Sequence, residues 1–114
     1  MLWVNRANTG IGNRGNRQKG CIVGLHYHLH QADYWYVPIG TARVVLHDLR
    51  TGSPTDGATQ VIDLGARQDG SHDHRGIFIP PGVAHGFASL TDMAITYLVD
   101  SYYNQTDENG LAWN

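Results

Sequence analysis

The sequence is poor in the features that mark secreted, membrane-spanning and helical proteins. Its 114 residues include one cysteine, Cys21, so no disulfide can form within the chain. No apolar run approaches the roughly 20 residues that a membrane span requires, and the opening residues lack the apolar core of a signal peptide. Helix formers are scarce, since the chain has one Glu, one Lys and two Met. We therefore expect a cytoplasmic protein with few or no helices and no membrane partner.

The length and the charge distribution narrow the function classes further. A chain of this length has room for one hydrophobic core, so residues 1–114 are expected to form a single domain. Residues 1–19 carry four basic residues and no acid, whereas residues 20–114 carry four arginines against ten acids. A nucleic-acid-binding protein needs basic residues over its folded body, and here they gather near the N-terminus. We therefore expect no nucleic-acid partner. Residues 1–19 are expected to form a loop-like basic arm, with a flap that contacts phosphate as the alternative.

Short β-rich runs separated by turn residues make up most of the chain. Pro38 and Gly40 interrupt the longest run, which predicts two strands there rather than one. Strands at this spacing favour a sandwich or a closed barrel, so we predict an all-β fold. The expected strands lie within residues 21–30, 33–49, 59–64, 76–80, 83–90 and 93–103.

Histidines and one acid are spaced like metal ligands. His26 and His28 are two residues apart on an expected strand, so their side chains share one face. Asp33 at the start of the next strand can add a carboxylate, and His85 can arrive from a distant strand. The predicted metal set is His26, His28, Asp33 and His85, and Zn, Mn, Ni or Fe would suit it.

The other histidines carry weaker signals. His30 continues the alternation of His26 and His28 but is expected to be structural. His47, His72 and His74 are expected to be scattered surface residues, with a cap over the site as the alternative for His72 and His74.

The spacing of these ligands, with the Pro80-Pro81-Gly82 corner before His85, resembles the two-motif metal signature of the cupin superfamily. Asp33 stands where most members have Glu. The resemblance implies a cupin jelly-roll barrel, also called a double-stranded β-helix.

A second resemblance covers more of the chain. Residues 19–113 are similar to the central part of the dTDP-4-dehydrorhamnose 3,5-epimerase family, a branch of the cupins. The stretches that match, in order, are GLHYH (24–28), QAD (31–33), DLRTGSPT (48–55), IPPGVAHGF (79–87), SLTDMA (89–94), YLVDSYY (97–103) and ENGLAW (108–113).

The second resemblance implies proton transfer next to a ketone, and hence an isomerase that acts on a nucleotide sugar. His26 takes the position of the base that removes a proton alpha to the C4 carbonyl, and Tyr97 that of the acid that returns one. His85, Tyr103 and Glu108 fall on positions that line the sugar pocket. The family mechanism needs no cofactor, and family members are dimers, so a homodimer is expected.

The sequence departs from the family where the family has cations. Val23 stands where the family has arginine, and Asp33 and Leu98 stand where it has lysine. A diphosphate needs arginine or lysine contacts, for which Arg50, Arg43 and the N-terminal arm are the candidates.

The substitutions at positions 28 and 33 convert a metal-free site into the metal set. His28 replaces a glutamine and Asp33 replaces the lysine that stabilises the enolate, so a divalent ion could take over that role. His26 would then be a ligand, and Tyr97, Tyr103 or Glu108 would have to take the proton.

Three functions stay open at this point. The first is an epimerase-like isomerase acting beside the 4-keto group of a deoxysugar nucleotide, with or without a metal. The second is a small metal-dependent cupin, an oxygenase, isomerase or lyase of another small molecule. The third is a non-catalytic sugar-binding cupin that stacks sugar rings on Tyr34, Trp35, Tyr36, Tyr102 or Trp113.

Overall fold

The computed structural model describes residues 12–101 and 104–112, and almost all of its regular structure is β. The strands are β1 (Gly12–Arg17), β2 (Ile22–Tyr27), β3 (Asp33–Ile39), β4 (Thr41–Asp48), β5 (Thr59–Ala66), β6 (His72–Asp73), β7 (Ile77–Ile79), β8 (Val83–Ser89), β9 (Met93–Val99) and β10 (Asn109–Gly110). A short 3-10 helix, η1, spans Gln105–Asp107. The described residues contain no helix long and apolar enough to cross a membrane.

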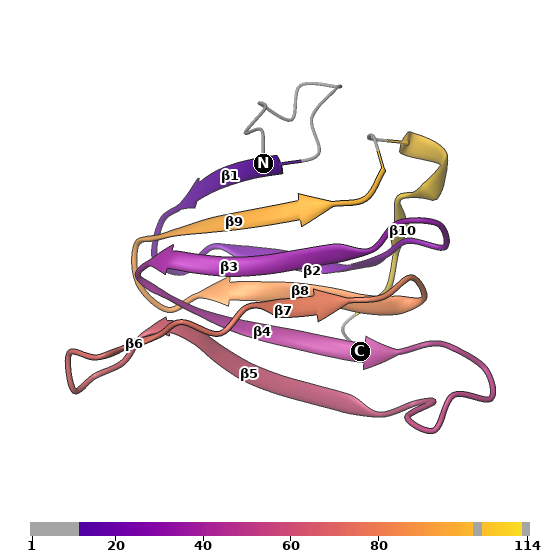
Figure 1. Cartoon of the computed structure of the whole chain (residues 1–114), viewed down its shortest axis with the longest axis horizontal. Helices are drawn as coiled ribbons and strands as arrows, with labels where there is room; N and C mark the ends of the chain where they lie inside the picture. The colour runs from indigo at the N-terminus through magenta and orange to yellow at the C-terminus, as the bar shows by residue number, and fades with distance from the viewer. Residues whose placement is uncertain (1–11, 102–103, 113–114) are drawn as a thin grey trace.

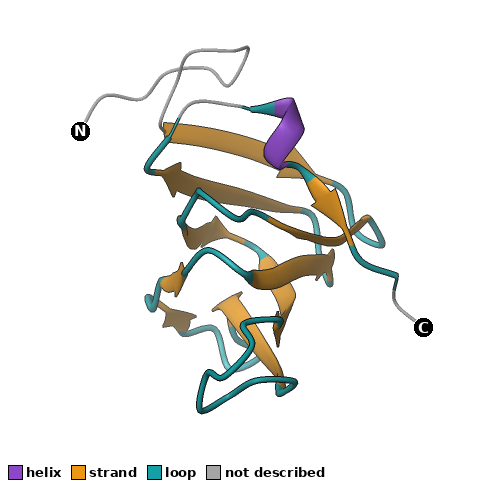
Figure 2. Ribbon diagram, turned by 90° about the vertical axis from the view of Figure 1, so that its right-hand side faces the viewer, coloured by secondary structure: helices purple, strands orange, loops and turns teal. Residues whose placement is uncertain are grey.

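The strands form two antiparallel sheets that face each other (Figures 1 and 2). The smaller sheet has the order β1-β9-β3-β7, and the larger has the order β10-β2-β8-β4-β5-β6. Neighbours in each sheet are mostly far apart in sequence, so the chain crosses repeatedly between the sheets, as it does in a jelly roll. The all-β fold expected from the sequence is confirmed.

The core lies between the two sheets and follows the alternation of strand side chains. Trp35 and Val37 of β3 point inward from the smaller sheet, and Val44 of β4 and Phe87 of β8 meet them from the larger sheet. Burying a side chain of this size stabilises the fold by about 1.5–3 kcal/mol. The core therefore holds together the two walls on which the site is built.

The turn between β3 and β4 confirms that the longest apolar run contains two strands. Gly40 has a φ of 77°, and a Cβ at this position would collide with the backbone oxygen of Asp92. Only glycine combines that backbone conformation with so close an approach. The chain therefore turns at Gly40 and passes from the smaller sheet to the larger one.

The prediction of a loop-like arm over residues 1–19 is wrong for residues 12–17. Residues 12–17 form β1, which pairs antiparallel with β9 from Gly12 opposite Leu98 to Arg17 opposite Met93. The backbone N–H and C=O groups of this segment form hydrogen bonds with the edge of β9, and any side chains allow this. The composition of the segment therefore does not reveal the strand. Residues 1–11 lie outside the described part of the chain.

Two expected strands end earlier than the sequence suggested, and both ends are held by carboxylates. The segment after β2 leaves the sheet at Tyr27, because Asp107 accepts hydrogen bonds from the backbone N–H groups of Leu29 (2.7 Å) and His30 (3.0 Å). The β9 strand ends at Val99, before Asp100, whose carboxylate accepts from the N–H of Ala32 at 2.9 Å. These contacts fix the loop that carries His28.

Candidate active site

The centre of the site is a pair of histidines on neighbouring strands of the larger sheet. His26 on β2 and His85 on β8 are directly opposed in the register, and their ring centroids are 4.2 Å apart. His28 follows the end of β2, with its ring 5.4 Å from that of His26 and 5.5 Å from that of His85. His28 and His85 are buried, whereas His26 is half-buried. The three imidazoles therefore form one cluster.

A local irregularity brings these strands unusually close. The register of β2 against β8 shifts between Val23 and His26. A Cβ on Gly86 would lie 2.6 Å from the backbone oxygen of Val23, so only glycine fits there. A bulge of this kind turns the strand and changes the direction of its side chains. It lets His26 and His85 face the same space.

Each imidazole of the cluster is oriented by a backbone carbonyl. The Nδ1 of His26 donates to Gly24 O at 3.2 Å, that of His28 to Asp107 O at 2.9 Å, and that of His85 to Val83 O at 2.9 Å. A carbonyl oxygen can only accept, so Nδ1 carries the proton in all three rings. The nitrogen left with a lone pair in each neutral ring is Nε2.

Asp33 lies at the start of β3 and faces two of these rings. Its Oδ1 is 4.0 Å from Nε2 of His28, and its Oδ2 is 3.7 Å from Nε2 of His85. The buried carboxylate is held by Gln31, whose amide donates to Oδ1 at 2.7 Å, and by the indole N–H of Trp35, 3.1 Å from Oδ2. The structure thus brings together all four residues that the sequence predicted as a metal set.

Burial favours the neutral form of two histidines of the cluster, His85 and His26. It lowers the pKa of His85, and the neighbouring His26 lowers it further, while the carbonyl of Val83 and the carboxylate of Asp33 act in the opposite direction. Burial likewise lowers the pKa of His26, against an opposing effect of the Gly24 carbonyl. Both rings are therefore uncharged at neutral pH, the form in which imidazole accepts a proton or binds a metal.

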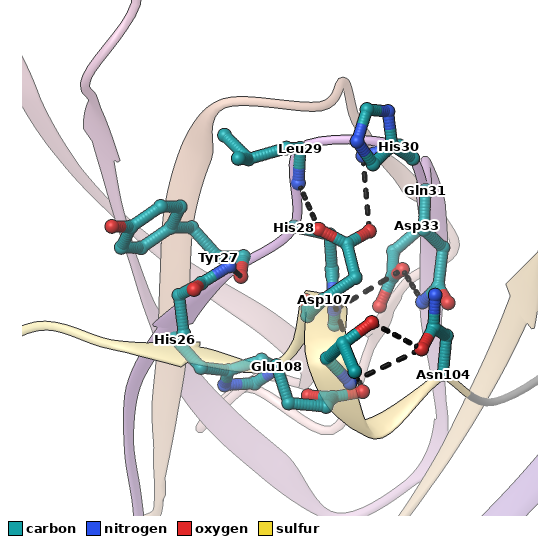
Figure 3. Close-up of polar contacts among 12 residues, drawn as sticks. His26, Tyr27, His28, Leu29, His30, Gln31, Asp33, Asn104, Asp107 and Glu108 are labelled. Atoms are coloured by element: carbon teal, nitrogen blue, oxygen red, sulfur yellow. Dashed lines mark hydrogen bonds and ion pairs between the residues drawn. The ribbon is translucent and has the colours of Figure 1, made fainter.

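The segment from η1 to β10 closes the site from the C-terminal side. Its last strand, β10, pairs with β2, with Gly110 opposite His26. Asp107 holds the backbone of the His28 loop, and its carbonyl accepts from His28. The Glu108 carboxylate lies 3.8 Å from Nδ1 of His28 and beside the ring of His26 (Figure 3).

A small cavity lies next to His26. Its volume is about 60 Å³, and its walls are Arg17, Val23, His26, Asp33, Trp35, Phe87, Ile95 and Tyr97. His26 belongs to the larger sheet and Tyr97, on β9, to the smaller one, so the two enter from opposite walls. The predicted base and acid therefore share one cavity.

Other predicted site residues lie elsewhere. Arg50 is exposed, forms a two-point ion pair with the buried carboxylate of Asp48 at 2.9 and 3.0 Å, and lines a separate recess near Pro80. Arg43 pairs with Asp63 on the outer face of the larger sheet. Tyr103 lies outside the described residues.

The remaining histidines lie away from the cluster. The rings of His72 and His74 stack at 4.4 Å, and the Nε2 of His72 donates to Val37 O at 2.9 Å. His72 is half-buried in β6, so the surface expectation is wrong for it, and neither ring lines the cavity. His47, which contacts Thr59 at 2.7 Å, is also half-buried, so the surface expectation is wrong for it too, whereas His30 and His74 are exposed.

The aromatic residues proposed for sugar stacking differ in their burial. Trp35 is a core residue whose indole N–H donates to Asp33, while Tyr34 is exposed. Tyr36 contacts Nδ1 of His74 through its hydroxyl group at 3.1 Å. Tyr102 and Trp113 lie outside the described residues.

Arg17 and Asp107 are site residues that the sequence analysis missed. Arg17 was assigned to the basic arm, yet it lines the cavity with His26 and Tyr97. Asp107 orients His28 from 79 positions further along the chain. An alternation of Asn, Gly and Arg after residue 12 was the only local sign of a strand that could face the cavity; no sequence signal pointed to Asp107.

Comparisons with known proteins agree with this architecture. A family model described as dTDP-4-dehydrorhamnose 3,5-epimerase matches residues 8–114. The chain is 40% identical over 99 residues to the spore coat polysaccharide biosynthesis protein SpsL of Bacillus subtilis, covering 83% of this chain and 62% of that protein. It is 37% identical over 105 residues to the dTDP-4-dehydrorhamnose 3,5-epimerase of Neisseria gonorrhoeae, covering 90% of this chain and 30% of that one.

A solved structure shows the same fold. The dTDP-4-dehydrorhamnose 3,5-epimerase of Bacillus anthracis, with TDP and PPi bound, superposes with a TM-score of 0.78 at 31% identity. The alignment covers 97% of this chain and 63% of that one. The chain thus spans less than two thirds of the length of each of these relatives. The cupin jelly roll expected from the sequence is confirmed, and the chain belongs to the dTDP-4-dehydrorhamnose 3,5-epimerase family.

Proposed function

We propose that the protein is an isomerase that inverts a carbon next to the 4-keto group of a deoxysugar nucleotide. The observation that carries this proposal is the placement of His26 and Tyr97 on opposite walls of one cavity. Inversion of a carbon requires that a proton leaves from one face and returns to the other. A base and an acid on opposite walls supply that arrangement.

His26 serves as the base in this mechanism. Its Nδ1–H is held by Gly24, so Nε2 is the atom that takes the proton from C3 or C5. The C–H electrons move into an enolate whose charge rests on the C4 oxygen. Tyr97 then donates its hydroxyl proton to the opposite face of the same carbon, and the carbonyl re-forms. The phenolate of Tyr97 and the imidazolium of His26 return to their starting forms by exchanging protons with water, so no redox partner is consumed.

Arg17 supplies the positive charge that the enolate needs. The family arginine implied at position 23 is Val23 here, and both Val23 and Arg17 line the cavity. A guanidinium on β1 can therefore stabilise the same oxygen from a neighbouring strand, in a site partly screened from water. His85 and Glu108 would line the sugar pocket, and Arg50 and Tyr103 would contact the rest of the nucleotide sugar.

The cavity as the described residues enclose it is smaller than a substrate. Ligand pockets usually begin at roughly 300 Å³, so a nucleotide sugar would bind across the cavity mouth and place only its reacting carbons inside. The names of relatives of this chain describe them as epimerases of dTDP-4-dehydrorhamnose, which supports a nucleotide-sugar substrate. A homodimer in the cytoplasm remains our proposal for the assembly and its location.

Solvent exchange tests the proposal directly. The protein is incubated in D₂O with a dTDP-4-keto-6-deoxyhexose, and proton NMR follows loss of the C3 and C5 signals. We expect exchange well above the buffer rate, and a loss of about 10²- to 10⁴-fold in His26→Asn, since that is the usual contribution of a positioned base. Exchange no faster than in buffer, or an equal rate in His26→Asn, would contradict the proposal.

A second candidate is a small metal-dependent cupin that acts on another small molecule. It is favoured by the convergence of three imidazoles and Asp33. The same exchange assay separates the two candidates. Exchange of the sugar nucleotide by EDTA-treated protein favours the first candidate, and absence of exchange both in EDTA and after a divalent ion is added favours the second.

A further inference from the structure

We propose that His26, His28 and His85 form a binding site for one divalent transition-metal ion, with Asp33 as its anionic partner. One ring nitrogen from each histidine lies within 4.8 Å of the others. They come from β2, the loop after it and β8, so the fold and not local sequence assembles them. The site shares His26 with the proposed epimerase activity, but its test does not depend on that activity, because metal binding is measured without any sugar.

The first argument is that the cluster contains acceptors with no donor among them. In each neutral ring Nδ1–H is used by a backbone carbonyl, which leaves Nε2 as a lone pair. Two of these nitrogens, from His28 and His85, face the carboxylate oxygens of Asp33 at 4.0 and 3.7 Å. Lone pairs and a carboxylate facing one another repel, and a cation bound by the imidazole nitrogens beside the carboxylate converts the repulsion into attraction.

The second argument is the state of His85. Its Nε2 is buried and has no hydrogen-bond partner, although its Nδ1 is satisfied by Val83. Leaving such a group unpaired is unfavourable, and native proteins rarely do so without a functional reason. An ion bound at Nε2 would satisfy it.

The third argument is that the surroundings match those of known metal ligands. A metal-binding imidazole usually donates its other N–H to a carbonyl or carboxylate, which fixes the tautomer and the ring orientation. All three histidines do so here. His28 is positioned twice, because Asp107 accepts from its ring and also holds the backbone of Leu29 and His30 (Figure 3).

The ligand types point to zinc or a similar ion. Three imidazoles suit Zn, Ni or Fe(II) rather than Ca or Mg, which prefer oxygen. Tetrahedral nitrogens bound at about 2.0–2.1 Å lie roughly 3.4 Å apart, so the three rings, whose nitrogens lie within 4.8 Å of one another, would have to move closer together on binding. Both oxygens of Asp33 already accept hydrogen bonds, so we assign it to balance the charge, together with Glu108 near His28.

The site also bears on His26 itself. Its Nε2 cannot bind an ion and take a proton at the same time. His26 also lines the cavity, so an ion held by the cluster would lie next to it. The loaded and metal-free forms would therefore differ in which group can act as the base.

The test measures metal binding on the full chain, without a tag and without a nickel column. Plasma mass spectrometry gives the metal content, and calorimetry with zinc chloride gives the affinity. We expect about one ion per chain and an affinity at least about tenfold lower in His28→Gln, since losing a ligand weakens binding at least as much as losing a residue that orients one. Glutamine can still donate to the Asp107 carbonyl.

The matched control is His47→Gln, which removes a histidine distant from the cluster and should keep the wild-type affinity. Circular dichroism in EDTA checks that each variant is folded. If His28→Gln does not fold, His26→Gln replaces it, because His26 is only half-buried. Equal zinc affinity in the wild type and a folded His28→Gln or His26→Gln variant overturns the proposal, as does a loss confined to His47→Gln.

Discussion

At the scale of single residues, the chemistry depends on which nitrogen of each histidine is available. Backbone carbonyls hold the Nδ1–H groups of His26, His28 and His85, so their reactivity is concentrated at Nε2. Burial lowers the pKa values of His26 and His85, which keeps both rings neutral. Neutral rings with one oriented lone pair suit both proton abstraction and metal binding.

Tyr97→Phe should separate proton removal from inversion. His26 can still remove a proton in this variant and return solvent deuterium to the same face. We therefore expect C3 or C5 exchange to persist while formation of the inverted sugar is lost. NMR coupling constants report the configuration, and His26→Asn is the control in which exchange and inversion both fail. Inverted product at the wild-type rate in Tyr97→Phe would show that another group is the acid.

Arg17→Gln should slow enolate formation. Arg17 lines the cavity with His26, so losing its guanidinium removes charge that is needed mainly in the transition state. We expect kcat to fall by about 10²- to 10³-fold, with a smaller change in KM. The control is Arg67→Gln, an exposed arginine that does not line this cavity. A change in KM alone would assign Arg17 to substrate binding instead.

At the scale of elements, the site depends on contacts between segments distant in sequence. The loop after β2 is held by Asp107, which precedes β10, and β10 in turn pairs with β2. The edge strand β1 brings Arg17 to the cavity by pairing with β9. Neither contact is local, so neither could be read from a hydrophobic period or a turn signal.

Asp107→Asn should loosen the His28 loop. The carboxylate accepts two backbone hydrogen bonds, from Leu29 and His30, and asparagine can replace only part of this. We expect a loss of about 1–3 kcal/mol in the free energy of unfolding, measured by urea denaturation. Asp56→Asn, in an exposed turn, should change it by less than about 0.5 kcal/mol. Equal free energies of unfolding in the two variants would show that the hydrogen bonds accepted by Asp107 do not stabilise the fold.

At the scale of the whole molecule, stability is linked to pH through paired carboxylates. Hydrogen bonds from Arg50 and Thr55 hold the pKa of Asp48 far below its usual value, and the Arg75 guanidinium lowers the pKa of Asp73 to about 2. The pKa of Asp63 is also lowered, chiefly by a hydrogen bond from Arg43. In each case the folded chain holds protons less tightly than the unfolded chain, in which an aspartate pKa is about 3.9.

The sign of the pH dependence follows from these shifts. Above about pH 5 both states are ionised and the stabilisation is fully present. As the pH falls through about 4 towards 2, the unfolded chain takes up protons first, so stability decreases. We expect the urea midpoint to fall between pH 5 and pH 3, and to fall less in Asp48→Asn, which starts from a lower midpoint at pH 7. A midpoint independent of pH over this range would rule out the linkage.

The sequence by itself determined the fold class and most of the site. Scarce helix formers and short β-rich runs predicted an all-β sandwich or barrel, and Pro38 and Gly40 predicted the break between β3 and β4. The alternation of His26 and His28, with Asp33 and His85, predicted residues that do lie together. Such signals are visible because strand periodicity, turn chemistry and ligand spacing are properties of short stretches of chain.

Only the tertiary structure decided which residues face one another. It placed His26 and Tyr97 on opposite walls, brought Arg17 into the same cavity, and left Arg50 paired with Asp48 outside it. It also showed that the three Nδ1–H groups are all used by backbone carbonyls. The physical reason is that strand pairing and backbone hydrogen bonds between distant segments set these positions. Such contacts leave no pattern in the local sequence.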